Sequence, residues 1–188
     1  MEPSLKTKLD RNIWITRKCR INASERLLSH AKYIEILNVY YSIFVIILSL
    51  ISLTKQDNLL SMISLSCSIA LTISIIYANV AGYRERSSSL KQNYIELQLL
   101  LDQLSCIDDN DTDSVVNISV KYAELLKSSE NHIPIDMYQL KVSNTDPGLA
   151  LSKEEKRSYY CQLAWRYLWR GALILLPLAA AILYFVLR

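Results

Sequence analysis

ILNVYYSIFVIILSLISL (residues 36–53) is an apolar run without a charged side chain, and LLSMISLSCSIALTISIIYANVAGY (residues 59–83) is a second one. As α-helices these runs would be roughly 27 and 37 Å long, against a bilayer hydrocarbon core of about 30 Å. Two buried helices of a soluble protein would need far more polar chain around them than this sequence of 188 residues provides. The two runs therefore predict a transmembrane helical hairpin.

A third apolar run, GALILLPLAAAILYFVL (residues 171–187), contains Pro177. Proline is tolerated in membrane helices because neighbouring groups can satisfy the carbonyl that it leaves free. The aromatic residues of WRYLWR (residues 165–170) precede the run, as expected at a membrane interface, and the arginines there can reach the headgroups. We expect a third span, with a helix lying in the membrane plane as the alternative.

The basic residues predict the orientation of these spans. The first 32 residues contain eight of them, whereas the loop between the first two runs contains only Lys55. Further basic residues follow the second run and precede the third, and only Arg188 follows the third. Because cytoplasmic flanks are enriched in Lys and Arg, we expect the N-terminus to be cytoplasmic and the C-terminus to lie on the outer side of the membrane.

The rest of the chain has the pattern of packed cytoplasmic helices. We expect an all-α membrane protein with a basic N-terminal helix (1–33), a transmembrane hairpin (34–83), a cytoplasmic helical region (84–142), a linker with a basic pre-membrane segment (143–166) and a third transmembrane helix (167–188). The basic helix, over residues 10–31, has a weakly apolar face. It would lie on anionic lipid or pack against the cytoplasmic helices, and both alternatives stay open.

Heptad-like spacing follows the second span. The spaced residues are Leu90, Tyr94, Leu97, Leu101 and Leu104. This pattern is typical of a coiled-coil seam between copies or of helix packing within the chain. A second amphipathic helix is expected over residues 114–129, with Val115, Ile118, Tyr122 and Leu125 on one face. Asp113 or Ser114 would be its N-cap, after the acidic loop of residues 107–114.

Residues suited to catalysis or to metal binding are few. The three glycines, Gly82, Gly148 and Gly171, form no phosphate-binding loop, and the four cysteines have no metal-site or redox spacing. Glu130, His132 and Asp136 fit no known metal motif, so hydrogen bonds that fix a turn are the favoured interpretation. The net charge of +3 is too small to indicate nucleic-acid binding. We expect no enzyme activity, no metal and no cofactor.

Both hairpin spans carry a narrow polar stripe on a helical wheel. The stripe residues are Asn38, Ser42, Ser49 and Ser52 in the first span and Ser61, Ser64, Ser68, Thr72 and Asn79 in the second. Such residues commonly hydrogen-bond membrane helices to each other. The alternative is that they line a water-filled path, which requires a homo-oligomer because a single hairpin cannot enclose a pore.

Three segments resemble the SLATT family of bacterial two-transmembrane effector proteins. They are IWITRKCRINASERL (residues 13–27), YRERSSSLKQNYIELQLLL (residues 83–101) and YAELLKSSENHIPID (residues 122–136). The likeness covers roughly residues 11–140 and is greatest to the branch encoded beside reverse transcriptases in defence loci. A third span departs from the two-span description of the family.

The resemblance implies an antiviral effector of the bacterial inner membrane, with its C-terminus in the periplasm if the third span crosses. Such an effector would open a pore or disrupt the bilayer when a sensor or a reverse transcriptase partner signals infection. A non-conducting anchor that docks a cytoplasmic enzyme is the alternative. A small transporter subunit is disfavoured, because the spans contain no charged residue and Glu35 only borders the first of them.

Overall fold

A computed structural model of the protein describes residues 4–108 and 111–186. Over these residues the chain is helical and contains no strand, which confirms the predicted all-α class. Three predictions reach outside this part of the chain: the acidic loop at residues 109–110, the N-terminal region at residues 1–3, and the periplasmic Arg188.

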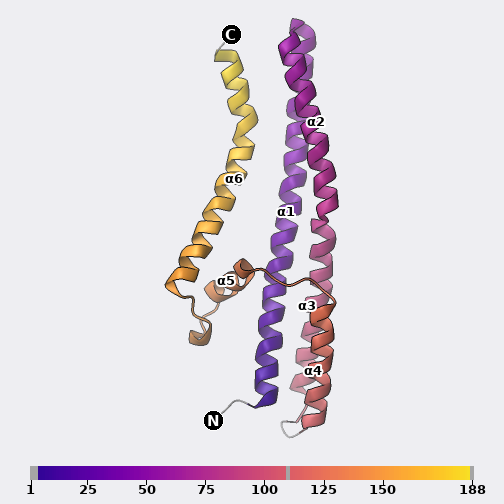
Figure 1. The fold of residues 1–188 in the computed structure, drawn as a ribbon, viewed down its shortest axis with the longest axis vertical. Helices are drawn as coiled ribbons and strands as arrows, with labels where there is room; N and C mark the ends of the chain where they lie inside the picture. Colours follow the sequence, from indigo (N-terminus) through magenta and orange to yellow (C-terminus); the bar gives the residue numbers. More distant parts are fainter. Residues whose placement is uncertain (1–3, 109–110, 187–188) are drawn as a thin grey trace. The chain divides into compact units, whose positions relative to one another are not determined.

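The chain forms two compact units, and each unit is made of two stretches that are separate in the sequence. The first unit contains Met1–Leu28 and Arg84–Tyr159, and the membrane unit contains Ser29–Tyr83 and Tyr160–Arg188. Helix α1 (Leu5–Lys55) contributes to both units (Figure 1). No glycine or proline lies between residues 4 and 81, so nothing in the local sequence interrupts this helix.

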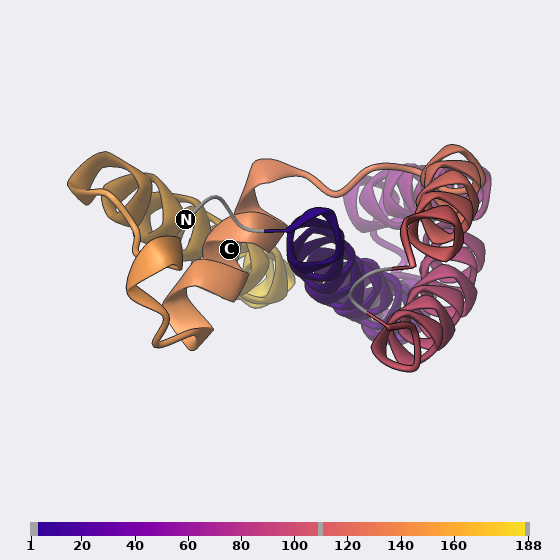
Figure 2. The same cartoon turned by 90° about the horizontal axis from the view of Figure 1, so that it is seen from below.

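The first unit packs the N-terminal part of α1 against α3 (Tyr83–Ser105) and α4 (Thr112–Lys127), as Figure 2 shows along the helices. One cluster of buried apolar residues in this unit contains Leu9, Ile13, Leu97, Leu100, Leu104, Val115 and Ile118. Of the two alternatives for the basic helix, packing against the neighbouring helices is therefore the one observed. The unit also contains α5 (Pro134–Ser143) and a short 3-10 turn (Pro147–Leu149).

The leucines of the heptad-like pattern lie inside this unit. Leu90, Leu97 and Leu104 are buried, and Leu97 and Leu104 belong to the core shared with α1 and α4. Leu101 packs at the edge of that core, and Tyr94 is half-buried. In this structure of a single chain, the spacing thus serves packing within the chain.

Helix α4 begins two residues earlier than expected. Its N-cap is Asp111, whose carboxylate accepts a hydrogen bond from the amide of Ser114, so the prediction of Asp113 or Ser114 as the cap is wrong. Hydrogen bonding to the Ser114 side chain, and secondly to its amide, lowers the pKa of the Asp111 carboxyl. The predicted apolar face is confirmed, because Val115 and Ile118 are buried and Tyr122 packs beside them.

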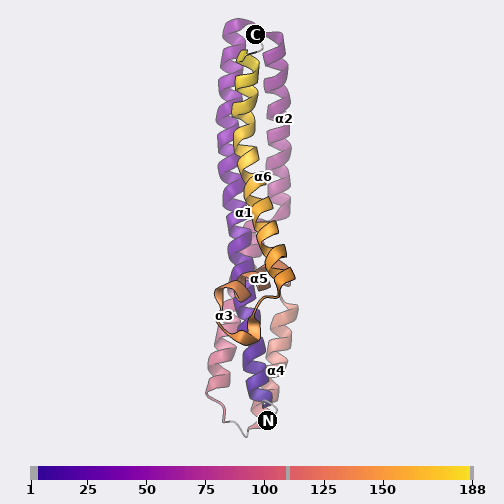
Figure 3. The same ribbon diagram turned by 90° about the vertical axis from the view of Figure 1, so that its left-hand side faces the viewer.

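The membrane unit consists of the second part of α1, helix α2 (Asn58–Ala81) and most of α6 (Lys153–Val186), which runs along the hairpin in Figure 3. α1, α6 and the continuous stretch Asn58–Ser105 are long and apolar enough to cross a membrane. α2 ends at Gly82, whose φ of 57° is left-handed and so suits a residue without a Cβ.

The hairpin turn is built from Lys55, Gln56 and Asp57. Gln56 adopts a left-handed φ of 49°, and the amide of Asp57 donates to the carbonyl of Ser52 at 3.2 Å, as in a Schellman ending. The Asp57 carboxylate then caps α2 by accepting from the amides of Leu59 and Leu60. The turn thus satisfies backbone groups at both helix ends.

Candidate functional site in the membrane unit

Four of the nine predicted stripe residues meet across one groove between α1 and α2. The hydroxyls of Ser49 and Ser64 are 2.6 Å apart, and those of Ser52 and Ser61 are 2.5 Å apart. The groove has a volume of about 330 Å³, and we call it the serine groove. Its lining residues are Val45, Ser49, Ser52, Leu53, Ser61, Ser64, Leu65 and Ser68. Within one chain these serines join the two spans, as polar residues commonly do in membranes.

The remaining stripe residues make no hydrogen bond across the hairpin within the described part of the chain. Thr72 donates to the carbonyl of Ser68, and Ser42 donates to that of Asn38, both within their own helices. Ser68, Thr72 and Asn79 are exposed on α2, and the side chain of Asn79 has no partner among residues 4–108 and 111–186. The polar face of α2 therefore extends beyond the contact with α1.

Helix α6 is attached to α1 by three tyrosine hydroxyls. Tyr33 donates to the carbonyl of Arg170 at 2.8 Å, Tyr41 to that of Leu173 at 2.7 Å and Tyr40 to that of Ile174 at 3.1 Å. These are side-chain-to-backbone bonds, so they depend on the position of α6 along α1 rather than on its side chains.

The Leu173 carbonyl is the one that Pro177 leaves without its helical donor, since it lies four residues earlier. The Tyr41 hydroxyl supplies the missing hydrogen bond. An unsatisfied carbonyl in the hydrocarbon region costs several kcal/mol, so this contact explains how α6 continues through Pro177.

At its other end α6 reaches the hairpin turn. The Tyr184 hydroxyl donates to the second carboxylate oxygen of Asp57 at 2.6 Å, while the first oxygen caps α2. The end of α6 and the hairpin loop therefore lie together. If the hairpin crosses a bilayer, α6 crosses it as well, which favours a third span over a helix lying in the membrane plane.

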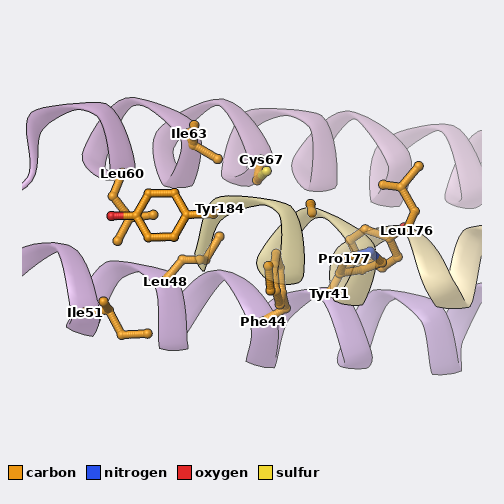
Figure 4. Close-up of a pocket in the computed structure, with 12 residues that line it drawn as sticks. Tyr41, Phe44, Leu48, Ile51, Leu60, Ile63, Cys67, Leu176, Pro177 and Tyr184 are labelled. Carbon is orange, nitrogen blue, oxygen red and sulfur yellow. The ribbon is translucent and has the colours of Figure 1, made fainter. Parts of the chain in front are cut away.

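An apolar pocket of about 130 Å³ lies among α1, α2 and α6 (Figure 4). Phe44 and Leu48 of α1, Cys67 of α2 and Pro177 of α6 contribute to its wall. The facing surfaces of the three helices are therefore apolar here, and they do not fill the space between them completely.

The first unit holds a second group of buried polar residues. The Arg20 guanidinium is fully buried and donates to the Asn93 side chain and to the carbonyls of Leu125 and Leu126. These carbonyls belong to the last turn of α4, where a cation is favoured by the helix dipole. Burial lowers the pKa of Arg20, yet a guanidinium stays charged at any physiological pH. Arg20 thereby links three helices.

Asp136 forms a buried, bidentate ion pair with Arg26, with N–O distances of 2.8 and 3.1 Å. One of its oxygens also accepts from the amide of Ile133, which fixes the turn before α5. Glu130 pairs with Arg86 at 2.7 Å. Burial lowers the pKa of His132, which favours the neutral imidazole. The two carboxylates are thus engaged by arginines, in agreement with a structural interpretation of this segment.

No cluster of three metal-ligating side chains occurs within the described ranges. The four cysteines are free thiols. Burial raises the pKa of Cys19 to about 12, so this thiol stays protonated and unreactive.

Several contacts in this site were not expected from the sequence. Tyr33, Tyr41, Asp57 and Tyr184 carry the attachment of α6 but belong to no stripe or motif. The one usable signal was Pro177, because a proline inside a span requires a donor for the carbonyl four residues earlier. The sequence does not say which hydroxyl supplies it.

The family comparison covers nearly the whole chain. The model described as SLATT_5, SMODS and SLOG-associating 2TM effector domain family 5, matches residues 2–183 and so includes most of α6. Searches of curated proteins and of solved structures gave no match. The resemblance seen in the three sequence segments is confirmed at the level of the family, and the chain belongs to the SMODS and SLOG-associating 2TM effector domain family 5.

Proposed function

We propose that the protein is an effector of a prokaryotic antiviral defence system that oligomerises in the inner membrane and makes it permeable on activation. Growth arrest or cell death would follow from the loss of membrane potential. Membership of a two-transmembrane effector family supports an effector role in conflict systems. The pore, the trigger and the oligomer are parts of the proposal.

The exposed polar face of α2 is the observation that supports permeation. Ser68, Thr72 and Asn79 lie on a helix that is long and apolar enough to span a membrane. Facing lipid, an Asn side chain would leave up to four hydrogen-bonding positions unsatisfied, because hydrocarbon offers no partner. Water or another copy of the chain would satisfy them.

The serine groove supports a particular kind of assembly. Its hydroxyls already join α1 to α2 within one chain, so the hairpin can enter an oligomer as a preformed unit. The face of Ser68, Thr72 and Asn79 would then turn toward the centre of the oligomer and form the water-filled path. The buried leucines of α3 are not part of the interface in this scheme.

The first unit is proposed to lie in the cytoplasm and to receive the activating signal from a sensor or from a reverse transcriptase partner. Its helices are joined by buried polar contacts, such as Arg20 with the end of α4, that would transmit a displacement of one helix to the others. We propose no direct contact with nucleic acid.

Induced expression in bacteria, together with the neighbouring defence genes and an infecting phage, tests this function. We expect a potential-sensitive dye to report depolarisation and growth to stop. Thr72→Val and Asn79→Leu should both restore the membrane potential, because they remove the polar groups from the proposed path.

Ser66→Ala is the matched control. Ser66 is exposed on α2 and donates its hydroxyl within the helix, to the carbonyl of Met62, just as Thr72 donates to Ser68. It lies on a different face from Thr72 and Asn79. This variant should depolarise cells as the wild type does. Normal potential and growth with the wild-type protein, while a cytoplasmic partner is still recruited to the membrane, would instead identify an anchor.

A further inference from the structure

A second, larger cavity lies in the membrane unit, near residues 33–41 of α1. It has a volume of about 400 Å³ and is lined from α1, α2 and α6. Tyr41, Cys67 and Leu176 border both this cavity and the smaller one of about 130 Å³. The two spaces therefore adjoin each other between the helices.

Water is a poor occupant of this cavity. At about 30 Å³ each, roughly a dozen waters would be needed to fill it, and each needs two to four polar partners. The hydroxyls of Tyr33 and Tyr41 are engaged with α6 carbonyls. Asn38 and Ser74 are the other oxygen-bearing side chains in the lining, and they can hold only a few waters.

A lipid acyl chain suits the mostly apolar lining of the cavity, and it can reach the cavity from the surface. Ala70, Ser74 and Leu176 line the cavity and are exposed at the surface of the membrane unit. In a bilayer these residues would face hydrocarbon, so a chain could enter from the side. Filling the space restores packing contacts that an empty cavity loses.

A positive charge stands at one end of the same cavity. The Arg170 guanidinium lies 4.8 Å from the ring centroid of Tyr33, which lines the cavity. Its Nη1 is 3.4 Å from the Ser29 hydroxyl, and its Nη2 has no hydrogen-bond partner among the described residues. Arg170 directly precedes the apolar run and follows exposed Trp165 and Trp169, so it lies at the level of the headgroups.

We propose that the membrane unit binds one anionic phospholipid, with its phosphate on Arg170 and an acyl chain in the cavity between α1, α2 and α6. The lipid would fill the gap between α6 and the hairpin. This binding goes beyond the proposed function, and it holds whether or not the protein forms a pore.

Native mass spectrometry of the full-length protein in detergent tests the site. The protein is titrated with phosphatidylglycerol or with phosphatidylcholine of the same acyl chains. We expect the wild type to retain one phosphatidylglycerol with roughly fivefold preference, the effect of one basic residue near a charged headgroup. Arg170→Gln should abolish the preference, and Ala70→Phe should reduce binding of both lipids by filling the cavity.

Two further variants separate binding from folding. Arg157→Gln removes an exposed arginine outside the membrane unit and should leave lipid retention unchanged. Arg170→Lys keeps the charge and should keep the preference, even if α6 is held less firmly. Equal retention of the two lipids by the wild type, or an unchanged preference in Arg170→Gln, would overturn the proposal. Loss of the preference in Arg170→Lys as well as in Arg170→Gln would also contradict it.

Discussion

At the scale of single residues, two arginines of α1 have different roles in the first unit. Arg20 satisfies carbonyls at the end of α4, whereas Arg26 neutralises the buried carboxylate of Asp136. Asp136 is completely buried, and only a small part of the Arg26 side chain is exposed. Removing one partner would leave an uncompensated charge away from water, which is much more costly than removing an exposed pair.

Arg26→Met should therefore lower the free energy of local opening around α5 by roughly 3–5 kcal/mol. Hydrogen–deuterium exchange of the α5 amides in the full-length protein measures this quantity. Arg86→Met is the control, because its pair with Glu130 is substantially exposed and should contribute at most about 1 kcal/mol. Equal exchange in the two variants would show that the buried pair does not hold α5.

At the scale of elements, α6 is the helix whose place depends most on particular contacts. Tyr41 satisfies the carbonyl freed by Pro177, and Tyr184 reaches the Asp57 cap of α2. The attachment thus combines several hydrogen bonds around a cavity with the packing of Pro177, which is fully buried. The two spans of the hairpin are joined to each other separately, through the serine groove.

Tyr41→Phe should lower the stability of the solubilised protein by at least about 0.6–2 kcal/mol, the range for hydrogen bonds between membrane helices, because it leaves the Leu173 carbonyl without a donor. Pro177→Ala restores an amide donor for the Leu173 carbonyl. In that background Tyr41→Phe should therefore lower the stability by less. Thermal unfolding of the four proteins in one detergent gives the coupling energy.

Tyr40→Phe provides the comparison. Its acceptor, the carbonyl of Ile174, keeps the amide of Leu178 as a helical donor, so no coupling to Pro177 is expected. If Tyr40→Phe and Tyr41→Phe had the same coupling energy to Pro177→Ala, a special role of the proline would be contradicted.

At the scale of the whole molecule, the sequence predicts the fold well because its strongest signals are uncharged runs. The three span candidates and the apolar face of Val115 and Ile118 need no tertiary information. The role of the Leu90–Leu104 pattern could not be decided in this way, since the same heptad spacing suits packing within a chain or between chains.

The candidate site was only partly visible in the sequence. The polar stripes identified Ser49, Ser52, Ser61 and Ser64, but a helical wheel does not say that these serines face each other across the hairpin. The contacts that attach α6 could not be predicted from the sequence, because bonds from tyrosine hydroxyls to backbone carbonyls produce no periodic pattern.

The proposed orientation of the molecule rests on the basic flanks and on the contact between Tyr184 and Asp57. This contact places the end of α6 beside the hairpin loop, so both should face the periplasm. A periplasm-active reporter enzyme should be active when fused after the C-terminus and inactive when inserted at residue 110. An inactive C-terminal fusion, with the protein intact in the membrane, would mean that α6 does not cross.

The polar face of α2 is the part of the molecule on which the proposed permeation depends. Single cysteines at 68, 72, 69 and 73, in a Cys67→Ala background, can be probed with a membrane-impermeant thiol reagent before and after activation. We expect labelling at 68 and 72 after activation, with 69 and 73 protected. Position 64 should stay protected in both states, because Ser64 is buried against Ser49. Protection at all five positions during a measured leak would contradict a path along this face.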